Sequence, residues 1–493
     1  MITVVILLLF LPPSILLLLQ TRKALRDSRS PPGPLGLPFI GNLLSLDTSK
    51  PHISLWRLSR SHSPLMSLKL GSVHVVVVSS PRAAEQVMKT HDLVFCSRPK
   101  LLGQHKLSYN RSDISFAPYG HSWREMRKIC VVHLLSNKQV QSFRPVREEE
   151  VLRMTQSLGC GRVVDLSAVV LGLTNALICR VAFGKEEPRT IRFDKLLIES
   201  EAMMGEFFIS DYLPWFGWVD RVSGLIGRLD RIFKDMDGFF EELIQERVNQ
   251  SRSKSINSNI LDILIQMKEE NSSSVALTWD NIKAILMDIF VAGTDTSAAT
   301  IIWAMTALIK NTSTMNKLQK EIRDLVSNRR QVNEEDLPKL PYLKAVIKET
   351  LRLFPPAPLL LPRQSMSDCN INGYTIPAKT LVIVNAWAIA RDPDTWENPD
   401  EFVPERFLDS PIDIIGTDFE AIPFGSGRRG CPGIAMGLVT VELALANLVH
   451  SFDWELPAGM TKEDIDTEVL PGITMHKKHP LCLVPMHRYI HQS

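Results

Sequence analysis

Residues 278–310, TWDNIKAILMDIFVAGTDTSAATIIWAMTALIK, form one long stretch that is apolar on nearly every face of a helix. Thr278 is a suitable N-cap, so the pattern predicts a helix that begins there and spans about 48 Å. A helix that is apolar all round has to be buried. The chain must therefore fold as a large helical body around this segment, and its 493 residues, 45% of them hydrophobic, are enough to do so.

The centre of this predicted helix carries Gly293, Thr294, Asp295, Thr296 and Ser297, which are poor helix formers. One interpretation is a helix crossing that requires small residues. The other is a local opening, where an acid and an alcohol face a cavity. The residues alone leave both interpretations open.

The rest of the chain predicts a mainly α fold with a smaller β-rich part. Helical patterns dominate from about residue 120 to 353, and Ser80-Pro81 predicts the start of a helix that runs to about residue 89. Strand patterns occur in a hairpin over residues 64–80, with its turn at Gly71-Ser72, and again at residues 372–390 and 479–486. Because no linker interrupts the middle, we expect one domain over residues 43–493 rather than the two to four that length suggests.

The N-terminus is predicted to anchor the chain in a membrane. Residues 1–20 are almost wholly apolar, and Arg22, Lys23, Arg26 and Arg29 follow, which places the remainder on the cytosolic side. A cleaved signal peptide is the alternative, but a charged segment before the apolar run and a clear cleavage site are lacking. Residues 21–42 are basic and rich in proline, which predicts a semi-rigid hinge between the membrane and the domain.

Composition excludes several other classes of protein. The net charge of +2, with both signs interspersed, gives no footprint for nucleic acid. The seven cysteines are scattered, without a CxxC pair, so they predict neither a disulfide framework nor a zinc site.

Cys431 is the cysteine with an unusual setting. It lies in PFGSGRRGCPG, residues 423–433, directly before a predicted helix whose free N–H groups would stabilise a sulfur anion. Glycines such as Gly425 would let the backbone approach a flat ligand, against which Phe424 could pack, and Arg429 could pair with an anionic edge of it. This turn is therefore expected to make one strongly donating thiolate ligand.

The turn also resembles a known signature. The pattern Phe424-x-x-Gly427-x-Arg429-x-Cys431-x-Gly433 matches the haem-binding motif of the cytochrome P450 family at every defined position. KETLR with Glu349 and Arg352, PERF with Arg406, and AGTDT ending at Thr296 match further family motifs in order. The resemblance covers nearly the whole chain. The anchor, PPGP and WREMRK make it similar to plant microsomal enzymes of the A-type group, which oxidise specialised metabolites.

The resemblance implies a cytochrome P450 fold that binds haem b through Cys431. It implies that the haem is also contacted by Pro423, Phe424, Gly425, Arg429, Trp123, Arg127 and Arg363. It further implies that Glu349, Arg352 and Arg406 form a buried structural triad, although Glu349 and Arg352 alone could be a surface ion pair.

The activity implied is a monooxygenase in the endoplasmic reticulum membrane that takes electrons from NADPH through NADPH-cytochrome P450 reductase and oxidises a small hydrophobic substrate with O2. Asp295 and Thr296 are expected to deliver protons. The expected substrate-pocket residues are Phe116, Phe208, Met287, Ala292, Ala357, Leu361 and Ile473. Residues 203–218, rich in aromatics and Met, could form an access or membrane surface or equally plain core.

Two other functions remain open from the sequence. One is a haem-thiolate dehydratase or isomerase that does not use oxygen, for example one acting on an aldoxime. The other is a membrane-anchored haem sensor without turnover. The Asp295-Thr296 pair argues against a hydroperoxide-cleaving enzyme, whose members lack it, but does not exclude dehydration.

Overall fold

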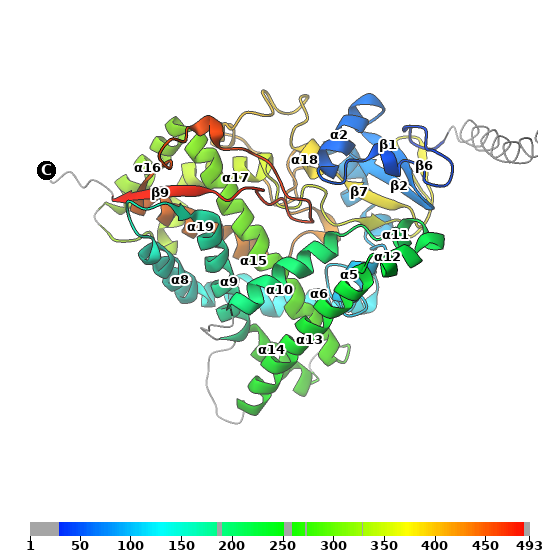
Figure 1. The fold of residues 1–493 in the computed structure, drawn as a ribbon, viewed down its shortest axis with the longest axis horizontal. Coiled ribbons are helices and arrows are strands. Elements are labelled where there is room, and N and C mark those ends of the chain that lie inside the picture. Colours follow the sequence, from blue (N-terminus) through cyan, green and yellow to red (C-terminus); the bar gives the residue numbers. More distant parts are fainter. Residues whose placement is uncertain (1–28, 185–189, 251–258, 272–273, 328, 488–493) are drawn as a thin grey trace, which may run out of the picture.

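The computed structural model describes residues 29–184, 190–250, 259–271, 274–327 and 329–487. The predicted anchor, residues 1–20, and the first part of the predicted hinge lie outside the described residues. Within them, helices form the larger part of the molecule and the strands gather mainly at one corner, at the upper right of Figure 1. The mainly α fold with a smaller β-rich part is confirmed.

The helices follow the predicted distribution. The longer ones before the central helix are α2 (Pro51–Ser61), α6 (His121–Lys128), α8 (Arg144–Ser157), α9 (Leu166–Phe183), α10 (Thr190–Gly205), α13 (Leu225–Gln250) and α14 (Ile260–Glu269). Those that follow are α15 (Trp279–Lys310), α16 (Thr312–Val326), α17 (Pro341–Leu353) and α19 (Ile434–Ser451). Short helices in the connections are α3 (Pro81–Glu85), α4 (Asp92–Phe95), α5 (Leu102–Leu107), α7 (Asn137–Ser142), α11 (Ile209–Tyr212), α12 (Trp218–Val222) and α18 (Ala386–Ile389).

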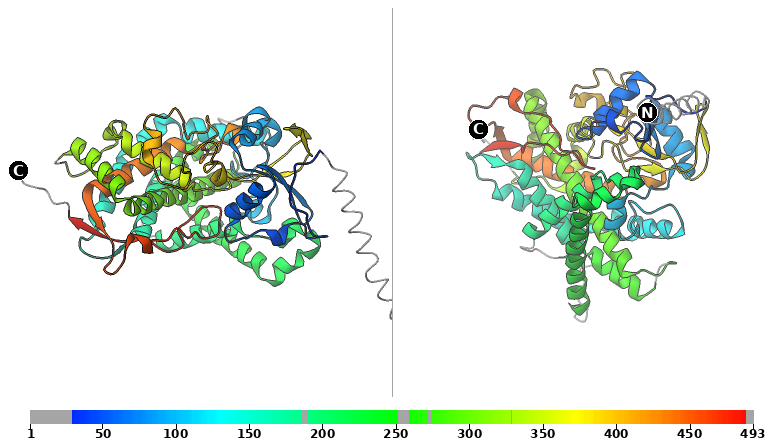
Figure 2. Two further views of the ribbon diagram at one scale, coloured as in Figure 1. Left: turned by 90° about the horizontal axis from the view of Figure 1, so that it is seen from above. Right: turned by 45° about the vertical axis from the view of Figure 1, so that its right-hand side comes forward.

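The central helix α15 begins where the sequence predicts. The Thr278 side chain accepts a hydrogen bond from the backbone of Asn281, whose own side chain accepts one from the backbone of Thr278. The helix then runs through the middle of the molecule, and α9 and α19 pack against it (Figure 2). Burial on all sides explains why its apolar pattern lacks a polar face.

The two halves of α15 lie in different hydrophobic cores. Its first half, with Ile282 and Phe290, packs in a core shared with α9, α10 and α13. Its second half, with Ala298 and Leu308, packs in a core shared with α8, α16, α17 and α19. The poor helix formers therefore fall at the junction between the two cores.

The strands form three sheets. The first has the order β1-β2-β7-β4 and consists of β1 (Leu65–Leu70), β2 (Val73–Val78), β7 (Leu381–Val384) and β4 (Arg363–Gln364). The predicted hairpin is confirmed, with Leu70 opposite Val73, and β7 pairs with β2 in parallel. The second sheet contains β3 (Val164–Asp165), β9 (Cys482–His487) and β8 (Phe452–Glu455), and the third contains β5 (Cys369–Ile371) and β6 (Tyr374–Ile376).

The helix predicted after Ser80 is also present. Ser80 caps α3 by accepting a hydrogen bond from Ala83, and the helix continues as a π-helical turn, Gln86–Thr90. The later part of the predicted semi-rigid hinge is attached to the first sheet. Pro32 accepts a hydrogen bond from the backbone of Ser67 and Asn42 pairs with Lys69 in both directions, so this segment packs along β1.

Three helices of the described part are long and apolar enough to cross a membrane by length and composition, namely α9, α15 and α19. More than half of the most apolar window of each is buried inside the protein. Most of the apolar side chains in these windows therefore pack inside the protein.

Candidate functional site

A cavity of about 310 Å³ lies beside the middle of α15. Ala292 and Thr296 of α15 line it together with the turn that carries Cys431. A Cβ added at Gly293 would lie 2.7 Å from the side chain of Ile178 on α9, so the two helices meet closely at this glycine. One side of the central segment is therefore a tight helix crossing, and another side brings the alcohol Thr296, but not the acid Asp295, to the cavity.

The turn before α19 presents the Cys431 sulfur to this cavity. The backbone N–H of Cys431 donates to the Phe424 carbonyl at 2.9 Å, and the N–H of Gly433 points at the sulfur, 3.4 Å away. Gly427 has φ +69°, and a Cβ there would lie 2.3 Å from the Met88 carbonyl oxygen. The path of the turn therefore requires glycine at this position.

The two arginines of the turn bond to groups other than the sulfur. Arg428 turns away to Asp92, 2.7 Å distant, and Arg429 donates to backbone carbonyls on another segment. Burial raises the pKa of the Cys431 thiol, and only the Gly433 N–H and the charge of Arg127 oppose this. The two arginines of the turn therefore do not stabilise the thiolate directly.

Four arginines line the main cavity: Arg98, Arg127, Arg363 and Arg429. Most of their hydrogen bonds go to backbone carbonyls, for example from Arg98 to Ser115 and Leu361. Burial lowers the pKa of Arg98 well below its ordinary value, and the charges of Arg429 and Arg363 lower it further. Such a surplus of buried positive charge fits a ligand with two carboxylates, as haem has.

Arg98 was missed by the sequence analysis. It stands alone between Ser97 and Pro99, and no spacing pattern marks it. Trp123, in contrast, was predicted as a haem contact, and the structure does not place it in the cavity wall. Its indole N–H donates to the Ile114 carbonyl at 2.9 Å, so it is not free to bind a carboxylate.

Most of the predicted pocket residues line the cavity. They are Phe116, Met287, Ala292, Ala357, Leu361 and Ile473, and the predicted cofactor residues Pro423, Phe424 and Gly425 join them. Phe208 does not. Its side chain is 1% exposed and packs in the core, near Gly103. The prediction for Phe208 was wrong because the segment after α10 turns this ring inward.

Thr296 and Asp295 are adjacent in sequence but face different surroundings. Thr296 lines the cavity, and its hydroxyl donates to the Ala292 carbonyl at 2.6 Å. Asp295 is buried outside the cavity wall, where its Oδ1 lies 2.7 Å from Nε2 of His476. Burial alone would raise the pKa of Asp295, but the charge of His476 lowers it.

Glu201 of α10 completes this cluster. Its Oε2 lies 3.4 Å from Nε2 of His476, and Glu201 also lines the main cavity. Burial raises the pKa of Glu201 to about 7. The sequence does not predict Glu201 or His476 as site residues, because they lie 275 positions apart and no local pattern connects them.

A second cavity, of about 230 Å³, lies next to the first. Both are lined by Met204, Leu360, Ile473 and Thr474, so side chains form part of the wall between them. The remaining wall of the second cavity includes Tyr212 and Leu359.

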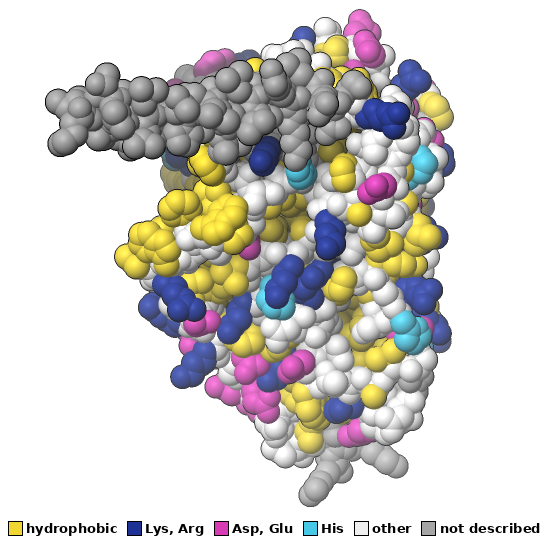
Figure 3. All heavy atoms as spheres, turned by 90° about the vertical axis from the view of Figure 1, so that its right-hand side faces the viewer, with side chains coloured by type: hydrophobic (Ala, Val, Ile, Leu, Met, Phe, Trp, Pro, Cys, Tyr) yellow, Lys and Arg dark blue, Asp and Glu magenta, His cyan; other side chains and the backbone are white. Residues whose placement is uncertain are grey.

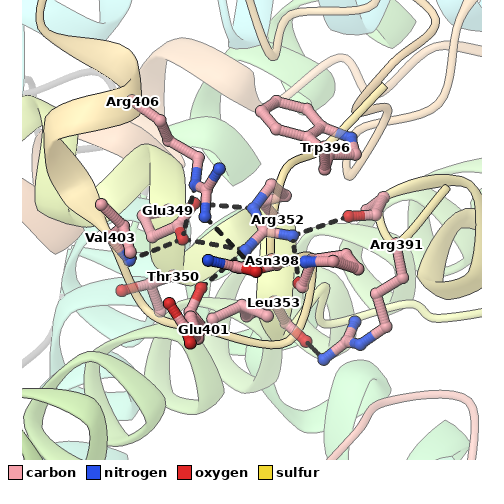
Figure 4. Close-up of polar contacts among 12 residues, drawn as sticks. Glu349, Thr350, Arg352, Leu353, Arg391, Trp396, Asn398, Glu401, Val403 and Arg406 are labelled. Atoms are coloured by element: carbon pink, nitrogen blue, oxygen red, sulfur yellow. Dashed lines mark hydrogen bonds and ion pairs between the residues drawn. The ribbon is translucent and has the colours of Figure 1, made fainter. Parts of the chain in front are cut away.

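The predicted triad is assembled between α17 and the turn Pro404–Phe407, and Figure 4 shows its three side chains pointing toward one another. Arg352 donates two hydrogen bonds to the Glu349 carboxylate, at 2.7 and 2.8 Å, and Arg406 donates a third at 3.1 Å. The Trp396 ring lies 5.1 Å from the Arg352 guanidinium carbon. Glu349 and Arg352 are fully buried, which excludes the surface ion pair.

The segment rich in aromatics and Met divides between core and surface. Met203 and Met204 are buried, whereas Trp215 is 72% exposed, and Phe216 and Trp218 are also exposed. Figure 3 shows hydrophobic side chains gathered on the face of the molecule that lies to the right in Figure 1, where α11, α12 and the first sheet are found.

Comparison with known proteins agrees with this site. A family model described as Cytochrome P450 matches residues 31–484. Cytochrome P450 71A9 of Glycine max is 50% identical, with 94% of this chain and 95% of that protein covered. The 6,7,8-trihydroxycoumarin synthase and 5-OH-xanthotoxin synthase of Pastinaca sativa are 47% and 46% identical, each with 96% of both chains covered.

A solved structure described as zebra fish cytochrome P450 with abiraterone has the same fold, with a TM-score of 0.75 and 24% identity, covering 89% of this chain and 99% of that one. Fold, motifs and relatives thus agree. The chain belongs to the cytochrome P450 family and is an oxidoreductase of the haem-thiolate monooxygenase class.

Proposed function

We propose that this enzyme inserts one oxygen atom of O2 into a small, hydrophobic, coumarin-type plant metabolite. The overall change is RH + O2 + NADPH + H⁺ → ROH + H2O + NADP⁺, with electrons delivered by NADPH-cytochrome P450 reductase. The observation that carries the proposal is one apolar cavity that brings together Cys431, the arginine cluster and Thr296. When bound, haem b supplies the iron that activates oxygen, and a thiolate ligand favours O–O cleavage.

The residues of this chain have distinct proposed roles toward the haem. Cys431 would provide the sulfur ligand; its backbone N–H donates to the Phe424 carbonyl, and the Gly433 N–H faces the sulfur. Arg98, Arg127, Arg363 and Arg429 would hold the haem carboxylates, and Pro423, Phe424 and Gly425 would pack against the ring. The triad of Glu349, Arg352 and Arg406 has a structural role, because none of the three lines the cavity.

Thr296 and Asp295 are proposed to serve proton delivery. The Thr296 hydroxyl lies at the cavity surface, where it can orient a water molecule, since its bond to the Ala292 carbonyl leaves its oxygen free to accept. Asp295 acts from behind the wall through its ion pair with His476. Controlled proton supply is needed because the reaction consumes protons at a site that must exclude bulk water.

The substrate class is supported by the pocket and by relatives. The cavity wall is largely apolar, with Phe116, Met287 and Leu361 available to pack against a flat ring system. Two of the relatives reported above are named as synthases of hydroxylated coumarin and xanthotoxin compounds. A small aromatic lactone is therefore the proposed ligand.

We further propose that the enzyme is a single-pass protein of the endoplasmic reticulum membrane. Residues 1–20 would be the anchor, residues 21–42 the hinge, and residues 43–493 the cytosolic catalytic domain. The basic residues after the apolar run support this orientation. The exposed Trp215, Phe216 and Trp218 would rest against the lipid surface.

The test uses the full-length chain with reductase in lipid vesicles. Coumarin, xanthotoxin and an aldoxime are screened for shifts of the haem spectrum, and bound compounds are incubated with NADPH under ¹⁸O2. The proposal expects a hydroxylated product that carries ¹⁸O and does not form without oxygen. Turnover that persists without oxygen would instead establish a dehydratase or isomerase.

A further inference from the structure

We propose that Glu201 and His476 form the proton route into this cavity, with Glu201 as the group that donates to it and His476 as the group that reloads Glu201. This inference rests on the proposed monooxygenase function and deepens it. In this route the proton enters the cavity from Glu201, and Asp295 does not itself donate it.

The position of the three side chains supports this assignment. Glu201 comes from α10, Asp295 from α15 and His476 from the chain before β9, and one ligand atom of each lies within 4.8 Å of the others. Glu201 lines the main cavity, whereas Asp295 and His476 do not. The His476 side chain is 29% exposed, so it links the buried carboxylates to solvent.

The hydrogen bonds indicate where the protons reside. Asp295 Oδ1 receives the N–H of His476, while Asp295 Oδ2 is buried without a donor as long as Glu201 is ionised. A protonated Glu201 supplies that donor, because its carboxyl lies beside Asp295. The arrangement is therefore an imidazolium, one carboxylate on Asp295 and one carboxylic acid on Glu201.

The electrostatics agree with this distribution. Burial and the neighbouring Asp295 together raise the pKa of Glu201 to about 7, against the opposing effect of His476. Burial would lower the pKa of His476, but the charges of Asp295 and Glu201 raise it to about 10. The groups that face Asp295 are His476, Glu201 and the Thr474 side chain.

One cycle moves a single proton. Glu201 releases its proton to a water molecule in the cavity and becomes a carboxylate. The His476 imidazolium transfers its Nε2 proton to Glu201 and keeps its Nδ1 proton. The neutral ring then turns outward, so that the emptied Nε2 takes a proton from solvent, and turns back as an imidazolium. Asp295 remains ionised throughout, so it is a positioning residue that fixes the His476 ring and favours its charged form.

The main test is Glu201→Gln in the full-length holoenzyme with reductase. Glutamine keeps the shape and can donate to Asp295 but cannot release a proton. We expect spectral binding of xanthotoxin to be unchanged and the fraction of NADPH electrons that ends in peroxide to rise at least fivefold. In the wild type this fraction should rise with pH through about 7, as Glu201 loses its proton, and in the variant it should be high and independent of pH.

Two further variants separate the route from a structural role. His476→Gln should also raise peroxide formation, most strongly at low pH, where the wild-type imidazolium is fully present. Glu199→Gln is the matched control, because Glu199 lies on α10 two positions before Glu201 and lines neither cavity. The fraction of NADPH electrons that ends in peroxide should be the same in this variant as in the wild type.

Infrared spectroscopy of the holoenzyme tests the proton on Glu201 without turnover. A carboxylic acid band should titrate near pH 7 in the wild type and be absent in Glu201→Gln. The inference is overturned when that band titrates near the ordinary pKa of glutamate. It is also overturned when Glu201→Gln forms the same fraction of peroxide as the wild type at every pH. Absence of oxygen-dependent product from the wild type would overturn the proposed function instead, and the infrared result would stand separately.

Discussion

Trp123 and Arg429 share one backbone acceptor. The indole N–H of Trp123 and a guanidinium N–H of Arg429 both donate to the Ile114 carbonyl, at 2.9 and 3.1 Å. The guanidinium carbon of Arg429 also lies 4.0 Å from the centre of the Trp123 ring. Trp123 therefore fixes the direction of a cavity-facing arginine without entering the cavity.

This relationship predicts a graded effect of substitutions at Trp123. Trp123→Phe keeps a ring against Arg429 and should retain most of the haem. Trp123→Ala removes the ring from a buried site, which costs about 3–5 kcal/mol in typical cores and frees Arg429. Haem content per polypeptide, measured after gel filtration, should fall severalfold in the alanine variant only. Equal retention in both variants would contradict the positioning role.

The ligand role of Cys431 predicts a spectroscopic loss. Cys431→Ala should lack the absorption band that reduced, CO-treated thiolate-ligated haem shows, and its activity should fall below detection, since no other cysteine lines the main cavity in the described part of the chain. Cys96→Ala, which removes a buried thiol elsewhere, is the control and should keep the band. A normal band in Cys431→Ala would refute the ligand assignment.

Thr296 is predicted to control how much product forms per NADPH consumed, rather than the binding of haem or substrate. Thr296→Ala should leave the haem spectrum and substrate binding intact, while product per NADPH falls about 10-fold or more as electrons pass to peroxide. Thr296→Ser retains the hydroxyl and should restore most of the coupling. Should alanine and serine behave alike, the hydroxyl has no part in proton delivery.

The buried triad predicts a large loss of stability from a single substitution. Arg352→Leu leaves the Glu349 carboxylate buried with one partner fewer, which typically costs about 3–5 kcal/mol. Urea unfolding of the holoenzyme measures this loss. The exposed pair of Lys89 and Glu85 offers the comparison, and Lys89→Gln should leave the unfolding midpoint nearly unchanged. A similar midpoint for Arg352→Leu would show that the triad is dispensable.

The ion pair of His476 predicts a specific pH dependence of stability. The pKa of His476 is raised from 6.5 to about 10 in the folded protein, so its contribution is fully present below pH 6.5 and is lost as pH rises toward 10. The stability difference between wild type and His476→Gln should therefore be largest at pH 6 and vanish by about pH 10. Unfolding curves at pH 6, 8 and 10 measure it, and a constant difference would contradict the ion pair.

Local patterns predicted the parts of the fold that local forces determine. The start of α15 at Thr278, the hairpin turn at Gly71-Ser72 and the α19 start after Gly433 all follow from capping and turn chemistry. The Cys431 turn could be predicted for the same reason, because its glycines and its place before a helix are adjacent in sequence.

Contacts between distant segments could not be predicted in this way. Arg98, Glu201 and His476 reach the site only through tertiary packing, and nothing in their sequence neighbourhoods sets them apart. The error at Phe208 has a related cause, as does the position of Trp123 outside the cavity wall, since the side-chain direction at both depends on packing against other segments. The pairing of Asn42 with Lys69 is another example, because a proline-rich segment can extend freely or lie along a sheet edge.

Shared side chains form part of the partition between the two cavities. Met204, one of these side chains, is unbranched, so its flexible thioether is the most adaptable part of the partition. A change at this one position would therefore alter how the two chambers connect.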